Sequence, residues 1–214
     1  MKIGVFDSGR GGEFIARGLK NILPQHEYVV VNDHQNMPYG SRSYDEVTQL
    51  TLNAVRPLIL QNCPIIIIAC NTATVAAIRT LRASHPNIRF IGIEPMVKPA
   101  AHASHTKHIT VLATPLTLAS QRYQQLIKDY GTGLTIDQPI VDDWAFKIEN
   151  HESNDISLND VGRSVASGSD TIVLACTHYI ELMPRIAEEF PGVAILEPTS
   201  AIAKQIVSLS ETIA

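Results

Sequence analysis

The chain has 214 residues, of which 45% are hydrophobic and 18% charged, a composition typical of a globular protein with a buried core. A formal net charge of −4 and a pI near 6.0 give no reason to expect nucleic acid or an anionic membrane as a partner. The longest apolar run has eight residues, far short of the roughly 20 that a membrane-spanning helix needs, and three cysteines cannot all pair. We therefore expect no membrane span and a reducing, cytoplasmic location.

In the first half of the chain, short runs rich in β-branched residues alternate with segments of helical periodicity. This alternation predicts a mainly parallel sheet with helices on both faces. A glycine turn, DSGRGG, follows the first strand, and a bend is expected near Pro57 in the second helix. We expect strands at 2–6, 27–32, 65–70 and 89–95, and helices at 14–23, 44–62 and 72–85.

The same alternation restarts in the second half. A polar stretch at 147–169 is expected to hold a loop and one helix, and an extended segment is expected at 135–143. The remaining strand-like segments lie at 108–116, 170–179 and 193–200, and the expected helices at 118–130, 179–190 and 199–211.

Three landmarks of the first half recur in the second half in the same order, each at the end of an expected strand. The matched pairs, at offsets of 107, 106 and 103 residues, are Asp7 with Thr114, Cys70 with Cys176, and Glu94 with Glu197. This repeat predicts an α/β fold of two pseudo-symmetric domains with mainly parallel sheets and an active site in the cleft between them. The first domain is expected to span 1–96 plus 198–214, with the C-terminal helix returning to it, and the second 97–197.

The two matched cysteines suggest a specific chemistry. Ligands of open parallel sheets bind beyond the carboxyl ends of the strands, where Cys70 and Cys176 are expected. Inverting a stereocentre next to a carboxylate requires a base on one face of the carbon and a proton donor on the other. One thiolate and one thiol can perform both tasks, and a helix N-terminus, expected just after each cysteine, favours the thiolate. A single cysteine at a strand end is more often a buried hydrophobe, and Cys63, which has no counterpart, is interpreted in that way.

Polar side chains around these strand ends are candidate partners of the thiols or of a ligand. Asp7 could orient an ammonium group, carry protons or simply close a turn, and His178 could support the neighbouring thiolate or be a structural histidine. The backbone of Tyr39 and Gly40 could hold a carboxylate, or form a plain surface turn. Neutral donors or N-cap residues are expected at Ser8, Asn71, Thr72, Thr114, Thr117 and Thr177, with capping favoured for Thr117.

Two other types of site are weighed and not favoured. Gly9 and Gly11 fit a dinucleotide fingerprint, but position 14 is phenylalanine, so the third glycine is missing even though Asp33 could serve as the ribose ligand. A zinc site built from Cys70, Cys176 and His178 lacks the usual paired-ligand spacing. We therefore expect neither a metal nor a cofactor.

The motifs DSGRGG, MPYGSRS, ACNTA, ATPLT and ACTHY, in this order, closely resemble those of the glutamate racemases in the aspartate/glutamate racemase family. The resemblance covers residues 4 to about 198. It implies a cofactor-independent, two-thiol racemase that makes D-glutamate for peptidoglycan, often as a homodimer. It also implies that Cys70 acts on the D-enantiomer and Cys176 on the L-enantiomer, assisted by Asp7 and His178. The implied substrate-binding positions are Ser8, Tyr39, Gly40, Asn71, Thr72 and Thr177.

The chain departs from the family pattern at a few positions. Glu13 replaces an apolar residue, Ala175 a glycine and Ile180 a proline, and the chain is shorter than typical members. The family's assisting glutamate, before the second cysteine, matches no residue cleanly; Asp142, Asp143 and Glu149 stay open. The alternatives are a racemase of aspartate or another acidic amino acid, and a binding or regulatory relative without turnover.

Overall fold

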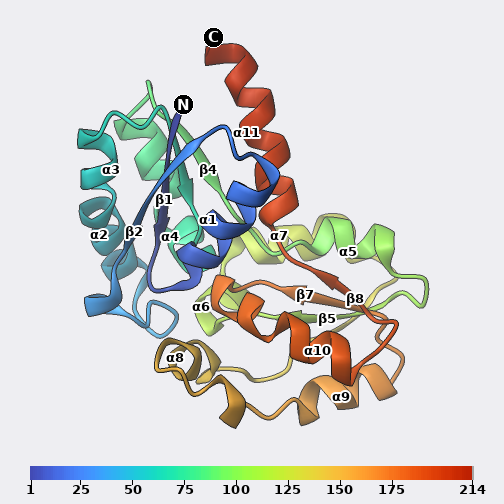
Figure 1. Ribbon diagram of the computed structural model, residues 1–214. Coiled ribbons are helices and arrows are strands. Elements are labelled where there is room, and N and C mark those ends of the chain that lie inside the picture. Colours follow the sequence, from blue (N-terminus) through green and yellow to red (C-terminus); the bar gives the residue numbers. More distant parts are fainter. Residues whose placement is uncertain (214) are drawn as a thin grey trace. The chain divides into compact units, whose positions relative to one another are not determined.

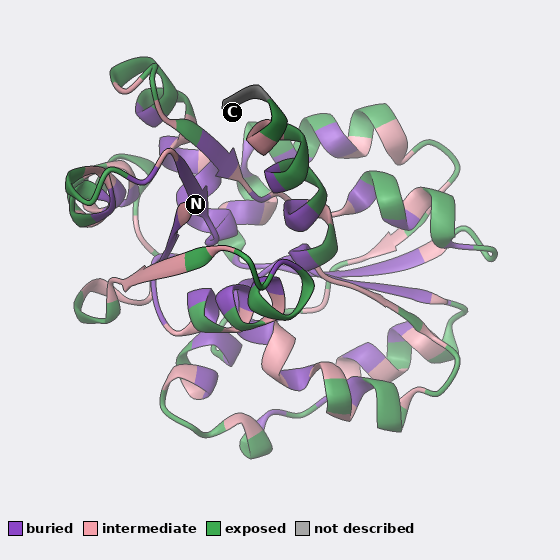
Figure 2. Ribbon diagram, turned by 45° about the horizontal axis from the view of Figure 1, so that its top comes forward, coloured by how far each residue is buried: buried purple, intermediate pink, exposed green. Residues whose placement is uncertain are grey.

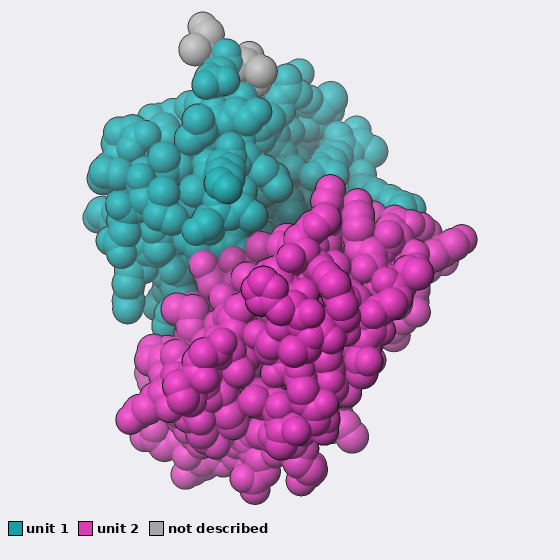
Figure 3. Space-filling model, turned by 90° about the vertical axis from the view of Figure 1, so that its right-hand side faces the viewer, with its two compact units in different colours: residues 1–93, 198–214 teal, residues 94–197 magenta. Residues whose placement is uncertain are grey.

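The computed structural model describes residues 1–213, with side chains to residue 211, and divides into two compact units. Unit 1 comprises Met1–Ile93 together with the segment that begins at Pro198, and unit 2 comprises Glu94–Glu197 (Figure 3). No helix among the described residues is both long and apolar enough to cross a membrane.

Unit 1 contains a four-stranded parallel sheet in the order β2-β1-β3-β4 (Figure 1). The central strand β3 consists of four isoleucines, all buried, because a strand inside a parallel sheet is covered on both faces. The edge strand β2 is only partly buried (Figure 2). The strands are β1 (Lys2–Asp7), β2 (Glu27–Asn32), β3 (Ile65–Ile68) and β4 (Arg89–Gly92).

The helices of unit 1 connect these parallel strands. Helix α1 packs against α11, and α2 packs against α4. Because parallel crossovers are right-handed and the first one runs in the opposite direction to the next two, α1 lies on one face of the sheet and α2 to α4 on the other. The bounds are α1 (Gly11–Ile22), η1 (His34–Asn36), α2 (Tyr44–Ala54), α3 (Arg56–Leu60), α4 (Asn71–Ser84) and α11 (Thr199–Ile213).

Unit 2 repeats this architecture with its own parallel sheet, in the order β6-β5-β7-β8. Its strands are β5 (His108–Leu112), β6 (Thr135–Asp137), β7 (Thr171–Leu174) and β8 (Ala194–Leu196). Its helices are α5 (Val97–Ala103), α6 (Pro115–Ala119), α7 (Gln121–Tyr130), α8 (Trp144–Glu149), η2 (Ser153–Asp155), α9 (Asn159–Ala166), η3 (Thr177–Leu182) and α10 (Met183–Glu189). Two four-stranded parallel sheets with helices around them confirm the predicted α/β fold class.

The alternation of side chains along the strands of unit 2 divides its core into two layers. Ile172 and Leu174 of β7 pack with the cluster that includes Trp144 and Ile186, on the face covered by α8 and α10. Val173, between them, packs with the opposite cluster, which includes residues of α5 and α7. Period-two alternation thus supplies both hydrophobic layers from one strand, and strand β7 is rigidly held up to the residue before Cys176.

Two of the expected helices are each divided into two. The helix expected at 44–62 breaks at Val55, and Pro57 lies in the first turn of α3, close to the expected bend. The helix expected at 118–130 breaks at Ser120, whose hydroxyl caps α7 by accepting a bond from the Tyr123 N–H at 3.1 Å. The bend expected near Pro57 is confirmed as a break between α2 and α3, whereas the expectation of one helix at 118–130 is wrong, because the Ser120 cap begins a new helix there.

The strand order creates a switch point in each sheet. In unit 1 the chain leaves β1 toward β2 and leaves β3 toward β4, in opposite directions. The two connections therefore separate at the carboxyl ends of these neighbouring strands and leave room for a ligand. The Ala69 N–H donates to the Phe6 carbonyl at 2.7 Å, which brings the residues that follow the two strands together. Strands β5 and β7 form the equivalent point in unit 2.

Candidate active site

Asp7, the last residue of β1, is completely buried at the switch point of unit 1. Its Oδ1 accepts a hydrogen bond from the Gly9 N–H at 2.9 Å, which fixes the carboxylate in the turn. The following helix approaches it very closely at Gly12, where a Cβ atom would lie 2.8 Å from the Asp7 Cβ. The glycines of DSGRGG therefore let α1 pack directly against this carboxylate, and the turn is built around Asp7.

The Cys70 thiol lies beside Ser8, the residue that follows Asp7. Ser8 Oγ donates to Cys70 Sγ at 3.3 Å, and the Ala73 N–H donates to the same sulfur at 3.4 Å. Both donors stabilise a negative charge on sulfur, and the second is part of the N-terminus of the 14-residue helix α4. Cys70 is 7% exposed, so the thiol is largely desolvated yet reachable.

Asn71 and Thr72 do not cap α4, as their residue types suggested. Cys70 is the N-cap residue, through its sulfur, and Asn71 and Thr72 are the first two helical residues. The expected capping role is wrong because the sulfur already accepts the Ala73 N–H that a cap would bind. Asn71 Oδ1 is buried without a hydrogen-bond partner among the described residues. A buried amide oxygen in this state is an acceptor suited to a ligand's N–H group.

Tyr39 and Gly40 belong to the segment that follows β2. Tyr39 is 1% exposed, and its ring packs against Phe6 of β1 with the ring centroids 6.5 Å apart. Its hydroxyl donates to Asp33 Oδ2 at 2.6 Å. Burial, above all, and then the bond to Asp33 raise the pKa of this phenol, with smaller contributions from the charges of Cys70 and Asp7. Tyr39 is therefore not a surface turn residue, and its ring is packed against Phe6 of β1, the strand that ends at Asp7.

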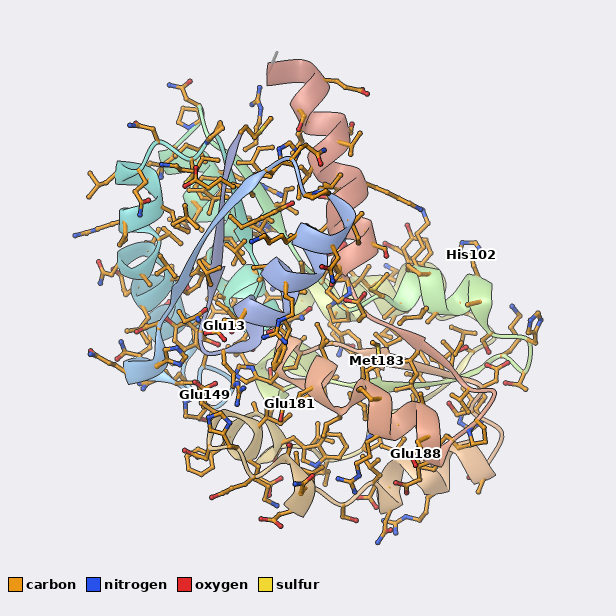
Figure 4. The ribbon with its side chains drawn as sticks, viewed as in Figure 1. Glu13, His102, Glu149, Glu181, Met183 and Glu188 are labelled. Carbon is orange, nitrogen blue, oxygen red and sulfur yellow. The ribbon has the colours of Figure 1, made fainter. Side chains whose placement is uncertain are left out.

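In unit 2, Cys176 has two polar partners in a chain. His178 Nδ1 lies 3.8 Å from Cys176 Sγ, and His178 Nε2 lies 2.9 Å from Glu149 Oε2 (Figure 4 labels Glu149). Because a carboxylate only accepts, Nε2 carries a proton, and Nδ1 is left to accept the thiol proton or, in the imidazolium, to donate to the thiolate. His178 is 3% exposed and Cys176 is 8% exposed. The geometry thus singles out Glu149 from the three acids that the sequence left open.

Cys176 lacks the α-helix N-terminus that the sequence suggested. The segment after it, Thr177–Leu182, is a 3₁₀ helix, and the Cys176 side chain makes no capping bond. The α-helix begins only at Met183, because Pro184 is tolerated only in a first turn. Thr177, 2% exposed, is the first residue of this 3₁₀ helix and not its cap. Cys176 thus has a histidine–glutamate pair beside it where Cys70 has the N-terminus of α4.

Thr114 and Thr117 lie at the carboxyl end of β5, the counterpart of β1. Thr114 is at the N-cap position of α6 without a side-chain capping bond, and its hydroxyl donates to Thr117 Oγ1 at 3.0 Å. Thr117 lies within α6, so the capping role favoured for it is wrong. Their paired hydroxyls are buried at the switch point of unit 2.

The structure gathers the sequence-derived candidates into two groups. The first cysteine cluster, in unit 1, consists of Asp7, Ser8, Tyr39, Gly40, Cys70, Asn71 and Thr72; the second cysteine cluster, in unit 2, consists of Thr114, Thr117, Glu149, Cys176, Thr177 and His178. Sequence reasoning left Glu149 unresolved and gave Asp33 no role here. No group of three or more His, Cys, Asp or Glu side chains with metal-binding geometry occurs within residues 1–213.

Two sheets of identical strand order, each with a buried thiol at its switch point, define an α/β protein with two matched thiol sites. The Asp/Glu/Hydantoin racemase family model matches residues 13–206. The chain belongs to this family.

Among its relatives, the glutamate racemase of Herpetosiphon aurantiacus is 38% identical over 209 residues, covering 95% of this chain and 82% of the relative. The glutamate racemase of Clostridium novyi is 38% identical over 194 residues, covering 88% and 73%. The Escherichia coli glutamate racemase, solved with L-glutamate and the activator UDP-MurNAc-ala, superposes with a TM-score of 0.86 at 25% identity over 98% of this chain and 82% of its own. The Francisella tularensis enzyme, solved with D-glutamate, gives a TM-score of 0.76 at 27% identity, covering 97% and 80%.

Proposed function

We propose that this protein interconverts L- and D-glutamate without a cofactor, with Cys70 and Cys176 as the two bases. The observation that carries the proposal is that the two thiols occupy the same position, after the third strand in chain order, in two sheets of the same strand order. Each thiol is accompanied by groups that stabilise a thiolate. The relatives that are 38% identical are glutamate racemases, which supports the choice of glutamate.

The reaction needs one thiolate and one thiol at a time. The thiolate removes the α-proton from one face of the substrate carbon, and the thiol on the other face returns a proton to the resulting carbanion. The two sulfurs then have exchanged protonation states, and the enzyme is ready for the reverse reaction. By family resemblance, Cys70 acts on D-glutamate and Cys176 on L-glutamate. Both cysteines are more than nine-tenths buried, so the transfer would occur away from bulk water.

The two clusters support their thiols by different means. At Cys70, the Ser8 hydroxyl and the Ala73 N–H stabilise the thiolate directly. At Cys176, His178 exchanges a proton with the sulfur while Glu149 fixes the orientation of the imidazole. This follows the nucleophile, base and orienting acid arrangement that activates thiols in other enzymes.

Substrate recognition is proposed for the neutral polar groups beside the sulfurs. Asn71, Thr72 and Thr177 present buried amide and hydroxyl groups suited to a carboxylate or an ammonium group, and Asn71 Oδ1 needs a donor. Asp7 is suited to the ammonium group because it is a buried carboxylate at the end of β1, the strand that pairs with β3. The backbone of Tyr39 and Gly40 would hold a carboxylate.

A supply of D-glutamate for peptidoglycan, a homodimer and a cytoplasmic location are the biological parts of the proposal. They rest on the motif resemblance and on the three reduced cysteines, Cys63, Cys70 and Cys176, which suit a reducing compartment. Aspartate is the second substrate to test. It is one methylene shorter than glutamate, and one methylene in a pocket changes the binding free energy by only about 1–3 kcal/mol.

The test uses the purified chain with L- or D-glutamate, and separately with aspartate, in deuterated water without added cofactor. We expect α-deuterium incorporation and loss of optical activity with glutamate, both abolished in Cys70→Ser and in Cys176→Ser. Cys63→Ser is the matched control, because this buried thiol lies outside both clusters, and it should retain activity. If the wild-type protein exchanges no α-proton of either amino acid, the chain is a binding protein and the proposal fails.

A further inference from the structure

Asp33 is a carboxylate that the sequence singled out and that the reaction does not use. It follows β2 directly and is the N-cap residue of η1. The dinucleotide fingerprint that would have made it a ribose ligand is incomplete, and the structure gives its carboxylate other partners. Tyr39 Oη donates to Asp33 Oδ2 at 2.6 Å, and Asn36 Nδ2 donates to both carboxylate oxygens, at 2.9 and 3.1 Å.

These bonds connect the whole segment 33–43 to the first cysteine cluster. The Asp33 N–H donates to the Asp7 carbonyl at 3.0 Å, so the segment begins on the strand end that carries the buried acid. Further along, Arg42 Nε donates to the Asn36 carbonyl at 2.9 Å, and the Arg42 N–H donates to the Tyr39 carbonyl at 3.1 Å. Asp33 therefore connects the end of β1, through its backbone, to the Tyr39–Gly40 peptide, through its carboxylate.

Tyr39 is the element through which Asp33 acts. The phenol ring is 1% exposed, and the tilted contact with Phe6 fixes it from the sheet side. A buried phenol needs a hydrogen-bond partner, and Asp33 supplies a charged one. The Tyr39 side chain is thus held at two points, at its hydroxyl by Asp33 and at its ring by Phe6.

We propose that Asp33 is a positioning residue that orients the Tyr39–Gly40 backbone for the substrate carboxylate by holding the Tyr39 hydroxyl. This inference rests on the proposed racemase function. The side-chain carboxylate of glutamate is remote from the α-carbon and keeps its charge throughout proton transfer, so its contact with this backbone is equally strong in the ground state and the transition state. Loss of such uniform binding raises KM and leaves kcat nearly unchanged.

The experiment compares Asp33→Ala, Asp33→Asn, Tyr39→Phe and the double variant Asp33→Ala/Tyr39→Phe, using L-glutamate and D-glutamate as substrates. We expect Asp33→Ala to raise KM about tenfold with a much smaller change in kcat. Asp33→Asn, which keeps an acceptor oxygen, should recover part of the loss. The double variant should be no worse than the worse single variant, because both remove one interaction.

Asp45→Ala is the matched control, because this exposed aspartate lies in the first turn of the next helix, α2, outside the Asp33 network. It should leave KM at the wild-type value. Thermal unfolding of every variant separates folding from positioning, and Tyr39→Phe provides the measurement if Asp33→Ala does not fold. An Asp33→Ala protein with a lower Tm but unchanged KM would overturn the inference, as would additive losses in the double variant. A wild-type chain that racemises neither substrate would instead overturn the proposed function and this inference with it.

Discussion

Replacing Glu149 by glutamine tests the support of Cys176, since the substitution removes the charge and keeps the size of the side chain. The ion pair is largely buried, with 3% of the His178 side chain and 14% of the Glu149 side chain exposed. A hydrogen bond to a charged group contributes about 1.5–3 kcal/mol when its loss is measured by mutation. At about 1.4 kcal/mol for each factor of ten, kcat should fall roughly tenfold to a hundredfold.

The assay follows racemisation from each enantiomer together with deuterium incorporation from solvent. Because the enantiomers have equal free energies in water, kcat/KM must fall by the same factor in both directions, whichever side is damaged. Isotope exchange separates the sides. With the Cys176 side impaired, Cys70 can still remove the α-proton of D-glutamate and, once its thiol has exchanged with solvent, return a deuteron to the same face. Exchange without inversion should therefore exceed inversion for D-glutamate and not for L-glutamate.

Asp143→Asn is the matched control for Glu149→Gln. Asp143 lies six residues earlier, also as a carboxylate, but it is 60% exposed and pairs with Lys147 across one helical turn at 2.7 Å. Exposed pairs of this kind contribute less than about 1 kcal/mol, so activity should be unchanged. Wild-type kcat in Glu149→Gln, or equal losses in both variants, would refute the assignment of Glu149 to Cys176.

Three further substitutions test other parts of the structure. Ser8→Ala removes a donor to Cys70 Sγ and should lower kcat about tenfold in steady-state assays, with unchanged stability. Gly12→Ala forces a Cβ to within 2.8 Å of the Asp7 Cβ and should lower the free energy of unfolding by about 1–3 kcal/mol in urea titrations. Burial acts to raise the pKa of Asp170, but hydrogen bonds from hydroxyl and backbone N–H groups lower it below its ordinary 3.8. The free energy of unfolding of Asp170→Ala should therefore be below the wild-type value by its full amount above about pH 4. The difference from wild type should shrink as the pH falls further.

The fold class could be predicted because the local signals were strong and agreed with one another. The isoleucine run of β3 is compatible only with burial on both faces of a sheet. The segments between such runs are long enough to hold a helix, as a parallel connection requires. The strand order could not be predicted, because no local signal says that β1 lies between β2 and β3. Helix ends depended on single residues such as Ser120 and Pro184, whose effect appears only once the competing hydrogen bonds are known.

Both thiols could be found from the repeat, whereas Glu149 could not. Asp142, Asp143 and Glu149 have the same chemistry, and only the packing of α8 distinguishes them. Trp144, Ala145 and Ile148 form the buried side of this helix, which leaves Asp143 exposed and turns Glu149, four residues after Ala145, toward the core. The spacing of four residues from Ala145 favours Glu149 only once the structure shows that Ala145 is buried.

The repeat conserves the position of the sulfur in each sheet and not its support. Cys70 lies at the N-terminus of a 14-residue helix and beside a serine hydroxyl, and neither of these groups titrates near neutral pH. Cys176 precedes a 3₁₀ helix of six residues, and its thiol lies next to an imidazole that can itself gain or lose a proton. In the proposed reaction the two sulfurs hold opposite protonation states and exchange them at each turnover, so a thiolate must be stabilised at both positions. The fixed donors at Cys70 and the His178–Glu149 pair at Cys176 are two different ways of stabilising that thiolate.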